Sequence, residues 1–308
     1  MSFKKAVAAW FNAEAINPSS ELSGPQVDWV RIIPFIGLHL ACFAVLFVGF
    51  SWFALGVFIA SYVVRMFAIT AFYHRYFAHR TFKASRPVQF MFALIGAAAT
   101  QRGPLWWAAH HRQHHKTADQ PEDPHSPRHG FWWSHMGWFL SREHFGTDHA
   151  QIPDLARYPE LRWLDRYDLL VPVVFAAGLF GLGALLERYA PGLGTSGGQL
   201  LVWGYFLSTV ALIHVTLTIN SLAHVWGSRR YATRDDSRNN WFLALLTLGE
   251  GWHNNHHHFP GSARQGFYWW EIDISFYGLK VMSWLGLVQG LKPVPDKIRR
   301  ARRLVPDT

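Results

Sequence analysis

The sequence predicts an all-α integral membrane protein with four transmembrane helices and a helical cap on the cytoplasmic side. Three observations favour this fold class. Half of the 308 residues are hydrophobic, several apolar runs are long enough to cross a bilayer, and the basic residues are confined to particular segments. No internal repeat or low-complexity linker divides the chain, so we expect a single domain over residues 1–308.

Four apolar segments have the length that a transmembrane helix requires. At 1.5 Å per residue, about 20 residues cover the roughly 30 Å of hydrocarbon in a bilayer. The predicted spans are residues 30–49, 52–73, 169–186 and 200–219. Two further apolar stretches, 88–100 and 241–248, are too short to cross, and we expect them to be buried or to lie along the membrane surface.

The basic residues predict which side of the membrane each segment occupies. Residues 74–167 carry twelve Lys and Arg, and residues 221–308 carry twelve more, whereas the turn near residue 50 and the loop 189–198 carry none. The positive-inside rule makes these two regions, and both termini, cytoplasmic. They form the predicted cap, and the first span would act as an uncleaved insertion signal. We expect the basic tail to meet anionic lipid headgroups and not nucleic acid.

The single cysteine limits the possible metal chemistry. Cys42 lies inside the first predicted span, and one thiol alone builds no internal disulfide, zinc–thiolate site or iron–sulfur cluster. A metal in this chain would therefore need nitrogen or oxygen ligands.

Eighteen histidines are present, and two groups of them share one spacing. The motifs "HRQHH" and "HNNHH" each place imidazoles at i, i+3 and i+4, which lie on one face of a helix. Neutral imidazole binds iron, zinc and copper, whereas crowded imidazolium ions repel one another. These six candidate ligands are His111, His114, His115, His253, His256 and His257.

Two predicted spans end in further candidate ligands. His74 and His79 in "HRYFAH" are about 140° apart on an ideal α-helix, so both face one site only if the helix bends or ends there. Asn220 and His224, at i and i+4, share a face at the end of the fourth span. Nine histidines suit two metal ions with four or five ligands each, with Asn220 binding directly or through water. The cap is therefore predicted to carry a histidine-rich di-metal site.

The remaining polar residues near these motifs have secondary roles. Glu250 and Asp119 are predicted to fix imidazole tautomers from behind the ligands. His39 and His214 lie within spans and are expected to be hydrogen-bonded there. The loop histidines lack ligand spacing, although two of them, His125 and His135, are candidate partners of the ligands; the others are His129, His144 and His149. His258 points about 100° away from the ring before it and is not counted.

The three histidine motifs together resemble those of a known enzyme family. The order "HRYFAH", "HRQHH", "NSLAH" and "HNNHH", with "DPHSPRHGFWWSHMGW" and "GEGWHNNHHHFP", is similar to the membrane-bound fatty acyl desaturases, specifically the acyl-CoA Δ9 (stearoyl-CoA) group. The resemblance runs from about residue 74 to residue 260.

The resemblance implies an oxygen-dependent reaction that converts a saturated fatty acyl chain to a cis-monounsaturated product. It assigns the nine histidines to two iron ions, with Asn220 reaching one through water; zinc can replace iron during preparation. Dioxygen is the co-substrate. Trp107 and Thr216 would flank the kink of an apolar substrate tunnel.

The acyl carrier stays open at this stage. The animal enzymes have an Arg-Lys pair for contact with coenzyme A, and this chain has Arg142-Glu143 at that place. Arg142 is a candidate carrier contact, but the lost lysine leaves acyl-CoA, acyl-carrier protein and intact lipid as possible substrates. Electrons must come from a separate protein of the ferredoxin, rubredoxin or cytochrome b5 type.

Two alternative functions differ in what they predict. A hydroxylase of the same histidine-motif superfamily would add an oxygen atom to the chain instead of removing two hydrogens. A metal-binding or transport protein without catalytic activity would carry its ligands in the middle of the spans, whereas these histidines lie at or beyond the span ends. The motifs leave double-bond position and chain length open.

Overall fold

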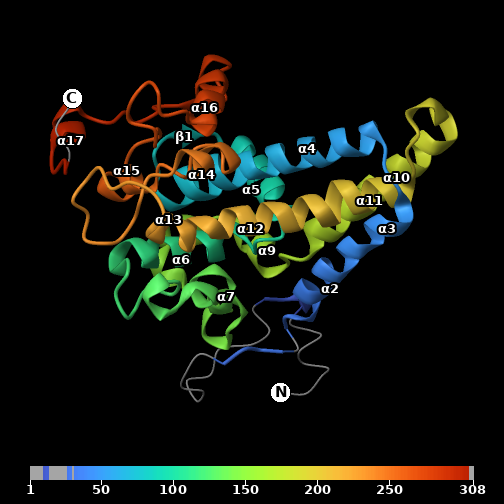
Figure 1. Cartoon of the computed structure of the whole chain (residues 1–308), viewed down its shortest axis with the longest axis horizontal. Coiled ribbons are helices and arrows are strands. Elements are labelled where there is room, and N and C mark those ends of the chain that lie inside the picture. Colours follow the sequence, from blue (N-terminus) through green and yellow to red (C-terminus); the bar gives the residue numbers. More distant parts are fainter. Residues whose placement is uncertain (1–9, 14–25, 30, 305–308) are drawn as a thin grey trace.

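The computed structural model describes residues 10–13, 26–29 and 31–304, which are mostly helical. Long helices run beside one another away from a cap of short helices and loops at one end (Figure 1). The only named strands among the described residues are β1 (Lys83–Ala84) and β2 (Val288–Gln289), which pair antiparallel. The all-α expectation is therefore confirmed in this part of the chain.

In the described part of the chain, three helices are long and apolar enough to cross a membrane. They are Trp52–Ala78, made of α4 (Trp52–Phe67) and η2 (Ala68–Ala78); α10 (Leu170–Tyr189); and Gly197–Val225, made of α11 (Gly197–Leu201), η8 (Val202–Leu207), α12 (Ser208–Asn220) and α13 (Leu222–Val225). The first predicted span is shorter than expected. It comprises α2 (Ile33–Ala41), η1 (Cys42–Ala44) and α3 (Val45–Val48), and residue 30 lies outside the described residues.

The turns of the two helical hairpins lie together at the end far from the cap (Figure 1). The indole N–H of Trp203 donates to the Gly49 carbonyl at 3.0 Å. The Ser51 hydroxyl donates to the Gln199 side chain at 2.6 Å, and the Gln199 amide donates to the Val48 carbonyl at 3.1 Å. Both hairpins therefore return toward the cap, as the charge pattern predicted.

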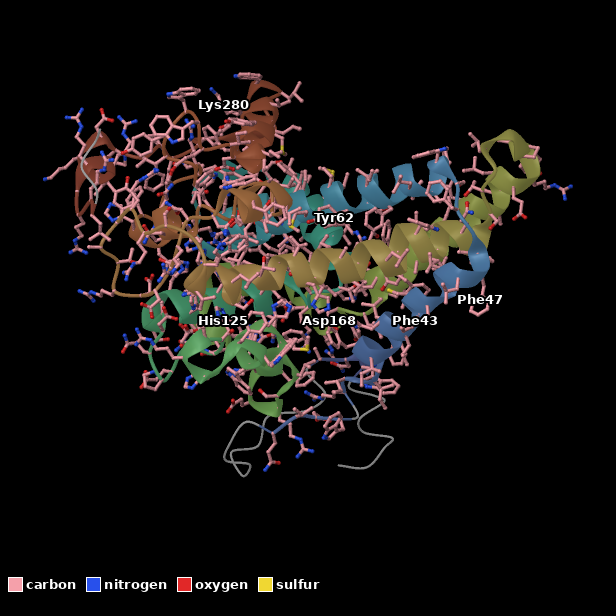
Figure 2. All side chains as sticks on the ribbon, in the orientation of Figure 1. Phe43, Phe47, Tyr62, His125, Asp168 and Lys280 are labelled. Atoms are coloured by element: carbon pink, nitrogen blue, oxygen red, sulfur yellow. The ribbon has the colours of Figure 1, made fainter. Side chains whose placement is uncertain are left out.

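The outer surface of the long helices is apolar. Phe43 and Phe47 are 64% and 87% exposed, and nitrogen and oxygen atoms gather mainly around the cap (Figure 2). Large exposed side chains of this kind suit hydrocarbon and not water.

One arginine is buried between the long helices. Arg65 of α4 is 2% exposed, and its guanidinium donates to Ser208 at 2.5 Å, to Thr209 at 2.6 Å and to the Ala98 carbonyl at 3.1 Å. Because ionisable groups at membrane depth need polar partners, these bonds fix α4 against α12 and the end of α5.

The two short apolar stretches form the helices α5 (Arg86–Ala97) and α14 (Trp241–Leu246). Helix α5 packs against η2, where the Tyr73 hydroxyl donates to the Ala93 carbonyl at 3.0 Å. Helix α14 leaves Trp241 and Phe242 exposed, as expected for a helix at a membrane surface. One stretch is therefore largely buried and the other is exposed.

The cap is built from short helices and long loops. Its elements are α6 (Pro104–Thr117), η3 (Pro127–His129), η4 (Trp133–Gly137), α7 (Trp138–Leu140), η5 (Arg142–His144), η6 (His149–Gln151), α8 (Pro153–Ala156), α9 (Pro159–Arg166), α15 (His253–His258), α16 (Ile274–Trp284) and α17 (Asp296–Arg300). Outside the cap, η7 (Pro191–Leu193) forms the turn after α10. The proline-rich segment after α6 is a loop up to η3, as its three prolines predict.

Candidate metal centre

A π-helix places the first two histidines on one side. Residues Ala68–Ala78 are fully buried and form η2, in which backbone bonds join i and i+5. The backbone N–H of His79 donates to the carbonyl of His74 at 3.2 Å, and the two ring centres are 4.9 Å apart. The wide π turn, followed by the end of the helix, thus removes the 140° separation expected on an α-helix.

All nine histidines proposed from the sequence lie in two groups. Cluster one contains His74, His79, His111, His115 and His256, and cluster two contains His114, His224, His253 and His257. Within each cluster, one nitrogen from each ring lies within 4.8 Å of the others. The far-separated motifs therefore converge into a five-membered and a four-membered set.

Helices α6 and α15 each contribute to both clusters, in opposite ways. Helix α6 directs His111 and His115 to cluster one and His114 to cluster two. Helix α15 directs His256 to cluster one and His253 and His257 to cluster two. The clusters thus lie side by side between these two helices.

The Nε2 atoms face one another at distances that suit ligands of one ion. His74 and His115 place Nε2 at 3.0 and 2.9 Å from Nε2 of His256, and His224 and His253 are 3.0 Å apart in the same way. Two nitrogens at right angles around an ion, each with a bond of about 2.1 Å, would be about 3.0 Å apart.

One pair in cluster two shows why a cation fits there. His114 and His257 each donate Nδ1–H to a carboxylate at 3.0 Å, Asp123 and Asp235 respectively. When both rings are neutral, their Nε2 atoms carry lone pairs, and these atoms face each other at 3.3 Å. Two opposed lone pairs repel unless a positive charge lies between them, so the donor set fits a metal ion.

Carboxylates contact four of the nine rings from behind. Asp119 lies 3.1 Å from Nδ1 of His224, and Glu250 contacts Nδ1 of His74, where the sequence analysis placed tautomer-fixing groups. Asp123 and Asp235 were missed. They lie nine residues after and 22 residues before the histidines that they contact, in loops where no periodicity links them to a ligand.

The electrostatics favour the neutral form at several rings of the clusters, beside ionised carboxylates. Burial, and then the neighbouring imidazoles, lower the pKa of His111, His115 and His256 well below its ordinary value. His114 is an exception: burial acts to lower its pKa, but the contact with Asp123 outweighs it and this pKa is raised. Burial acts to raise the pKa of Asp235, but the contact with His257 outweighs it, so this pKa is also lowered. Neutral rings offer the lone pairs that a metal needs.

A buried ion network holds Glu250 against His74. The guanidinium of Arg75 lies 3.0 Å from Glu250 and 2.9 Å from Asp273, and it also donates to the Ala263 carbonyl at 2.9 Å. Because Arg75 is adjacent to His74 in η2, this network fixes the ring and its carboxylate together.

The two asparagines of "HNNHH" hold α15 from its other face. The side-chain oxygen of Asn254 accepts the backbone N–H groups of Arg230 and Tyr231 at 2.9 and 2.8 Å. The amide of Asn255 donates to Glu271 at 2.9 Å. Both asparagines are fully buried, so the motif combines ligands on one face with anchors on the other.

Several histidines lie outside both clusters. His39 and His214, expected to be hydrogen-bonded within the bundle, lie 2.9 Å apart through Nε2, and His135 extends this chain at 3.0 Å. His135 therefore does not contact a ligand ring in the way anticipated. His125 stacks on His114 with ring centres 4.3 Å apart. His258 instead bonds the Ile298 carbonyl at 2.8 Å.

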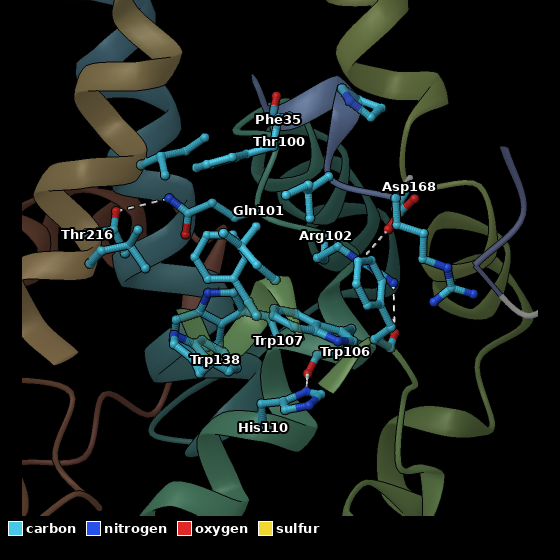
Figure 3. A pocket seen from close by; sticks show the side chains of 18 of the residues that line it. Phe35, Thr100, Gln101, Arg102, Trp106, Trp107, His110, Trp138, Asp168 and Thr216 are labelled. Atoms are coloured by element: carbon cyan, nitrogen blue, oxygen red, sulfur yellow. Dashed lines mark hydrogen bonds and ion pairs between the residues drawn. The ribbon is translucent and has the colours of Figure 1, made fainter. Parts of the chain in front are cut away.

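A cavity of about 250 Å³ lies beside the clusters. Trp107 stacks on His111 with ring centres 4.9 Å apart, and the Gln101 amide donates to Thr216 at 3.1 Å. Trp107, Thr216, His111 and Asn220 all line this cavity. Figure 3 shows the Gln101–Thr216 pair on one side of it and Arg102 beside Asp168 on the other. Asn220 thus borders the space between the clusters and the apolar wall.

A second, smaller cavity of about 40 Å³ lies against both clusters. It is lined by His74 and His111 of cluster one and by His114 and His253 of cluster two. Asn220 also lines it. Rings of both clusters therefore border this smaller cavity, and Asn220 lines both cavities.

Arg142 lies near the far end of the larger cavity but not on its wall. Its Nε lies 3.7 Å from Asp28, while Arg31 and Arg102 line the cavity itself. The sequence analysis named only Arg142, because the motif resemblance does not extend to residue 31 and gives residue 102 no role.

Comparison with known proteins identifies the family. The chain is 39% identical to the sn-2 palmitoyl-lipid 9-desaturase of Nostoc sp. (strain 36) over 93% of this chain and 97% of that protein. It is 37% identical to the sn-1 stearoyl-lipid 9-desaturase of Anabaena variabilis, over 89% and 97%, and to the Delta-9 acyl-lipid desaturase 1 of Arabidopsis thaliana, over 91% and 88%.

All three relatives are named for acyl-lipid substrates, so the narrower expectation of a place in the stearoyl-CoA group is not supported. The family model for fatty acid desaturases matches residues 31–276, which include both histidine clusters and the cavity wall from Arg31 to Asn220. The chain therefore belongs to the fatty acid desaturase family.

Proposed function

We propose that this protein introduces a cis double bond at the Δ9 position of a saturated fatty acyl chain carried on a membrane lipid. The observation that carries this proposal is the placement of two imidazole clusters beside one cavity of about 250 Å³. An acyl chain in that cavity would have a methylene pair next to the metal ligands. The relatives named as 9-desaturases of acyl lipids support the position and the carrier.

Each cluster would hold one iron ion. Cluster one offers five imidazoles and cluster two offers four, and Asn220, which borders the smaller cavity, would complete the second set directly or through water. When bound, the two ions would supply the activation of dioxygen. Zinc is a possible replacement in a preparation, because imidazole binds both metals.

The protein's own residues would bind and orient the acyl chain. Trp107 stacks on His111 of cluster one and lines the cavity with it, and the Gln101–Thr216 hydrogen bond would fix the opposite wall. These contacts would hold one part of the chain at a defined distance from the clusters. The surrounding apolar residues would exclude water from that part.

The reaction consumes two hydrogens of the chain, one dioxygen, two electrons and two protons, and it yields a double bond and two water molecules. The two electrons would come from a separate protein of the ferredoxin, rubredoxin or cytochrome b5 type. The twelve basic residues of the region from 221 to 308 would attract an acidic donor to the cap. The cap and both termini would face the cytoplasm.

The test is the lipid composition of cells that express the protein. We expect a new monounsaturated acyl group with its double bond at carbon 9, attached to membrane lipid. His256→Ala should abolish it, because this ring belongs to cluster one. His129→Ala, a change at an exposed histidine outside both clusters, should leave the product unchanged.

Product mass and carrier decide between the alternatives. A gain of one oxygen atom in place of the loss of two hydrogens would identify a hydroxylase. New double bonds that appear first in acyl-CoA or acyl-carrier protein would move the substrate to a thioester. An unaltered acyl composition in cells that supply iron and a compatible electron donor would contradict the proposal.

A further inference from the structure

Three arginines and two aspartates meet at the end of the larger cavity that lies away from the clusters. Arg102 Nε lies 2.8 Å from Asp168. Arg142 Nε and Arg31 Nε lie 3.7 and 4.0 Å from the same oxygen of Asp28. Arg31, Arg102 and Asp168 line the cavity itself. Among the described residues of this group, positive charges exceed negative charges by one.

Arg31 has the weakest ion pair of the three arginines, 4.0 Å from Asp28. Its side chain is only 7% exposed, and its Nε and Nη2 atoms are buried with no hydrogen bond. The guanidinium lies 4.5 Å from the ring centre of Phe145, and that of Arg102 lies 5.2 Å from the same ring. A buried donor without a hydrogen bond is unfavourable, so this geometry favours an anion in contact with Arg31.

We propose that Arg31, together with Arg102 and Arg142, binds the phosphate of an anionic glycerophospholipid whose acyl chain enters the cavity. These three residues are called the arginine site. The inference rests on the proposed function, because it names the class of lipid that presents the acyl chain. It also predicts that the substrate is an anionic phospholipid and not a neutral glycolipid.

The position of the arginine site decides between the possible anions. Arg31 and Arg102 line the same cavity as Trp107 and His111, so a chain that reaches cluster one has its ester end toward the arginines. In a glycerophospholipid the phosphate is bonded to the same glycerol as the acyl ester. In coenzyme A and acyl-carrier protein the whole pantetheine arm separates the phosphate from the thioester. A galactolipid presents no anion at all.

The chemistry of the guanidinium supports phosphate. Arginine presents parallel N–H groups that match two phosphate oxygens, and its hydrogen bonds to an anion are stronger than those to a neutral hydroxyl. A phosphodiester would satisfy both buried nitrogens of Arg31 and balance the excess positive charge. A sugar hydroxyl would leave the charge uncompensated. We therefore expect at least a tenfold preference for the anionic lipid.

The experiment measures lipid binding to the purified full-length protein in detergent by native mass spectrometry. The probes are dipalmitoyl phosphatidylglycerol, dipalmitoyl monogalactosyl diacylglycerol and palmitoyl-CoA. The wild type should bind phosphatidylglycerol at least tenfold more tightly than either of the others. Arg31→Gln should remove this preference, and Arg31→Lys should retain part of it because it keeps the charge.

Two controls separate loss of the site from loss of the fold. Arg188→Gln changes an exposed arginine at the C-terminal end of α10, far from the cap, and should keep the preference. Binding of the galactolipid should be the same in Arg31→Gln as in the wild type if the cavity is intact. Equal binding of both lipids by the wild type, or an unchanged preference in Arg31→Gln, would overturn the proposal, as would strongest binding of palmitoyl-CoA.

Product analysis with the same two lipids distinguishes this inference from the proposed function. Preferential binding of phosphatidylglycerol without any double bond, in the presence of iron and an electron donor, would leave the arginine site standing and refute the reaction. Equal desaturation of both lipids, with equal binding affinities, would support the proposed reaction and refute the arginine site.

Discussion

At the scale of single residues, the sequence predicts candidate metal ligands that the structure brings together in two clusters, but not every group that orients them. The spacings i, i+3 and i+4 predicted six of the nine rings, because a helix brings such positions to one face. Asp123 and Asp235 escaped detection, since each reaches its histidine from a loop. Arg31 was also missed, because only the structure shows that two of its nitrogen atoms are buried without a hydrogen bond.

Replacing one of these carboxylates should weaken the binding of a metal ion in cluster two. In Asp235→Asn the ring of His257 keeps its place but loses the negative charge at Nδ1, 3.0 Å away. Loss of such an outer partner typically lowers metal affinity about 10–100-fold. We expect the iron content at limiting iron to fall below that of the wild type, measured by plasma emission spectrometry.

The neighbouring residue provides the matched control. Asp236 pairs with Arg128 at the surface and contacts no ligand ring through its side chain. Asp236→Asn should bind as much iron as the wild type. Equal iron content in the two variants at every iron concentration would show that the contact with His257 does not support a metal.

At the scale of elements, the order and type of the helices follow from the sequence, whereas their detailed geometry does not. Four apolar segments predicted four helices, but the first is only 16 residues long, from Ile33 to Val48. The second extends five residues past its predicted end, to Ala78, and its last part is a π-helix. No sequence pattern within Ala68–Ala78 predicts the wider turn. Packing against neighbouring segments, and not local helix preference, selects the π-helix.

The tight approach of α14 to the segment before α15 gives a prediction at this scale. A Cβ on Gly251 would lie 2.1 Å from the backbone nitrogen of Ala244 and 2.4 Å from the carbonyl oxygen of Asn240. Gly251→Ala must therefore displace backbone, and overpacking of this kind costs about 1–3 kcal/mol or more. We expect a lower melting temperature and reduced iron content, because the first ligand of α15 follows two residues later.

An unobstructed glycine supplies the comparison. Gly56 lies in α4 and a Cβ there would meet nothing within 4 Å. Gly56→Ala should raise the stability by about 0.5–1 kcal/mol, since alanine is the better helix former. Melting curves that shift in the same direction for both variants would argue against the steric interpretation.

At the scale of the whole molecule, the charge distribution and the pairing of the helices both place the cap at one end of the long helices and the two hairpin turns at the other. The two hairpin turns contact each other through Trp203 and Gly49, and both lie opposite the cap (Figure 1). The sequence also predicts that the cap faces the cytoplasm, because the positive-inside rule depends only on where basic residues occur; this orientation stays a prediction. The sequence does not predict how nine rings divide between two clusters, since that depends on how α6 and α15 cross.

Cysteine labelling in intact cells tests the orientation. In a Cys42→Ala background, Lys297→Cys places a thiol on α17 and Gly192→Cys places one on η7; both positions are exposed. A membrane-impermeant maleimide added outside should label the thiol at 192 and not the one at 297. After the membrane is permeabilised, both should react. Labelling of position 297 in sealed cells would invert the proposed topology.

The exchange of ligands between α6 and α15 has a consequence for assembly. Each helix gives two rings to one cluster and one ring to the other, so neither set is complete until both helices are in place. The first ion to arrive therefore immobilises four or five rings and also brings the remaining ones into position for the second. Binding of the first ion therefore covers part of the entropy cost of ordering the rings for the second ion. The two ions should bind cooperatively and be released together.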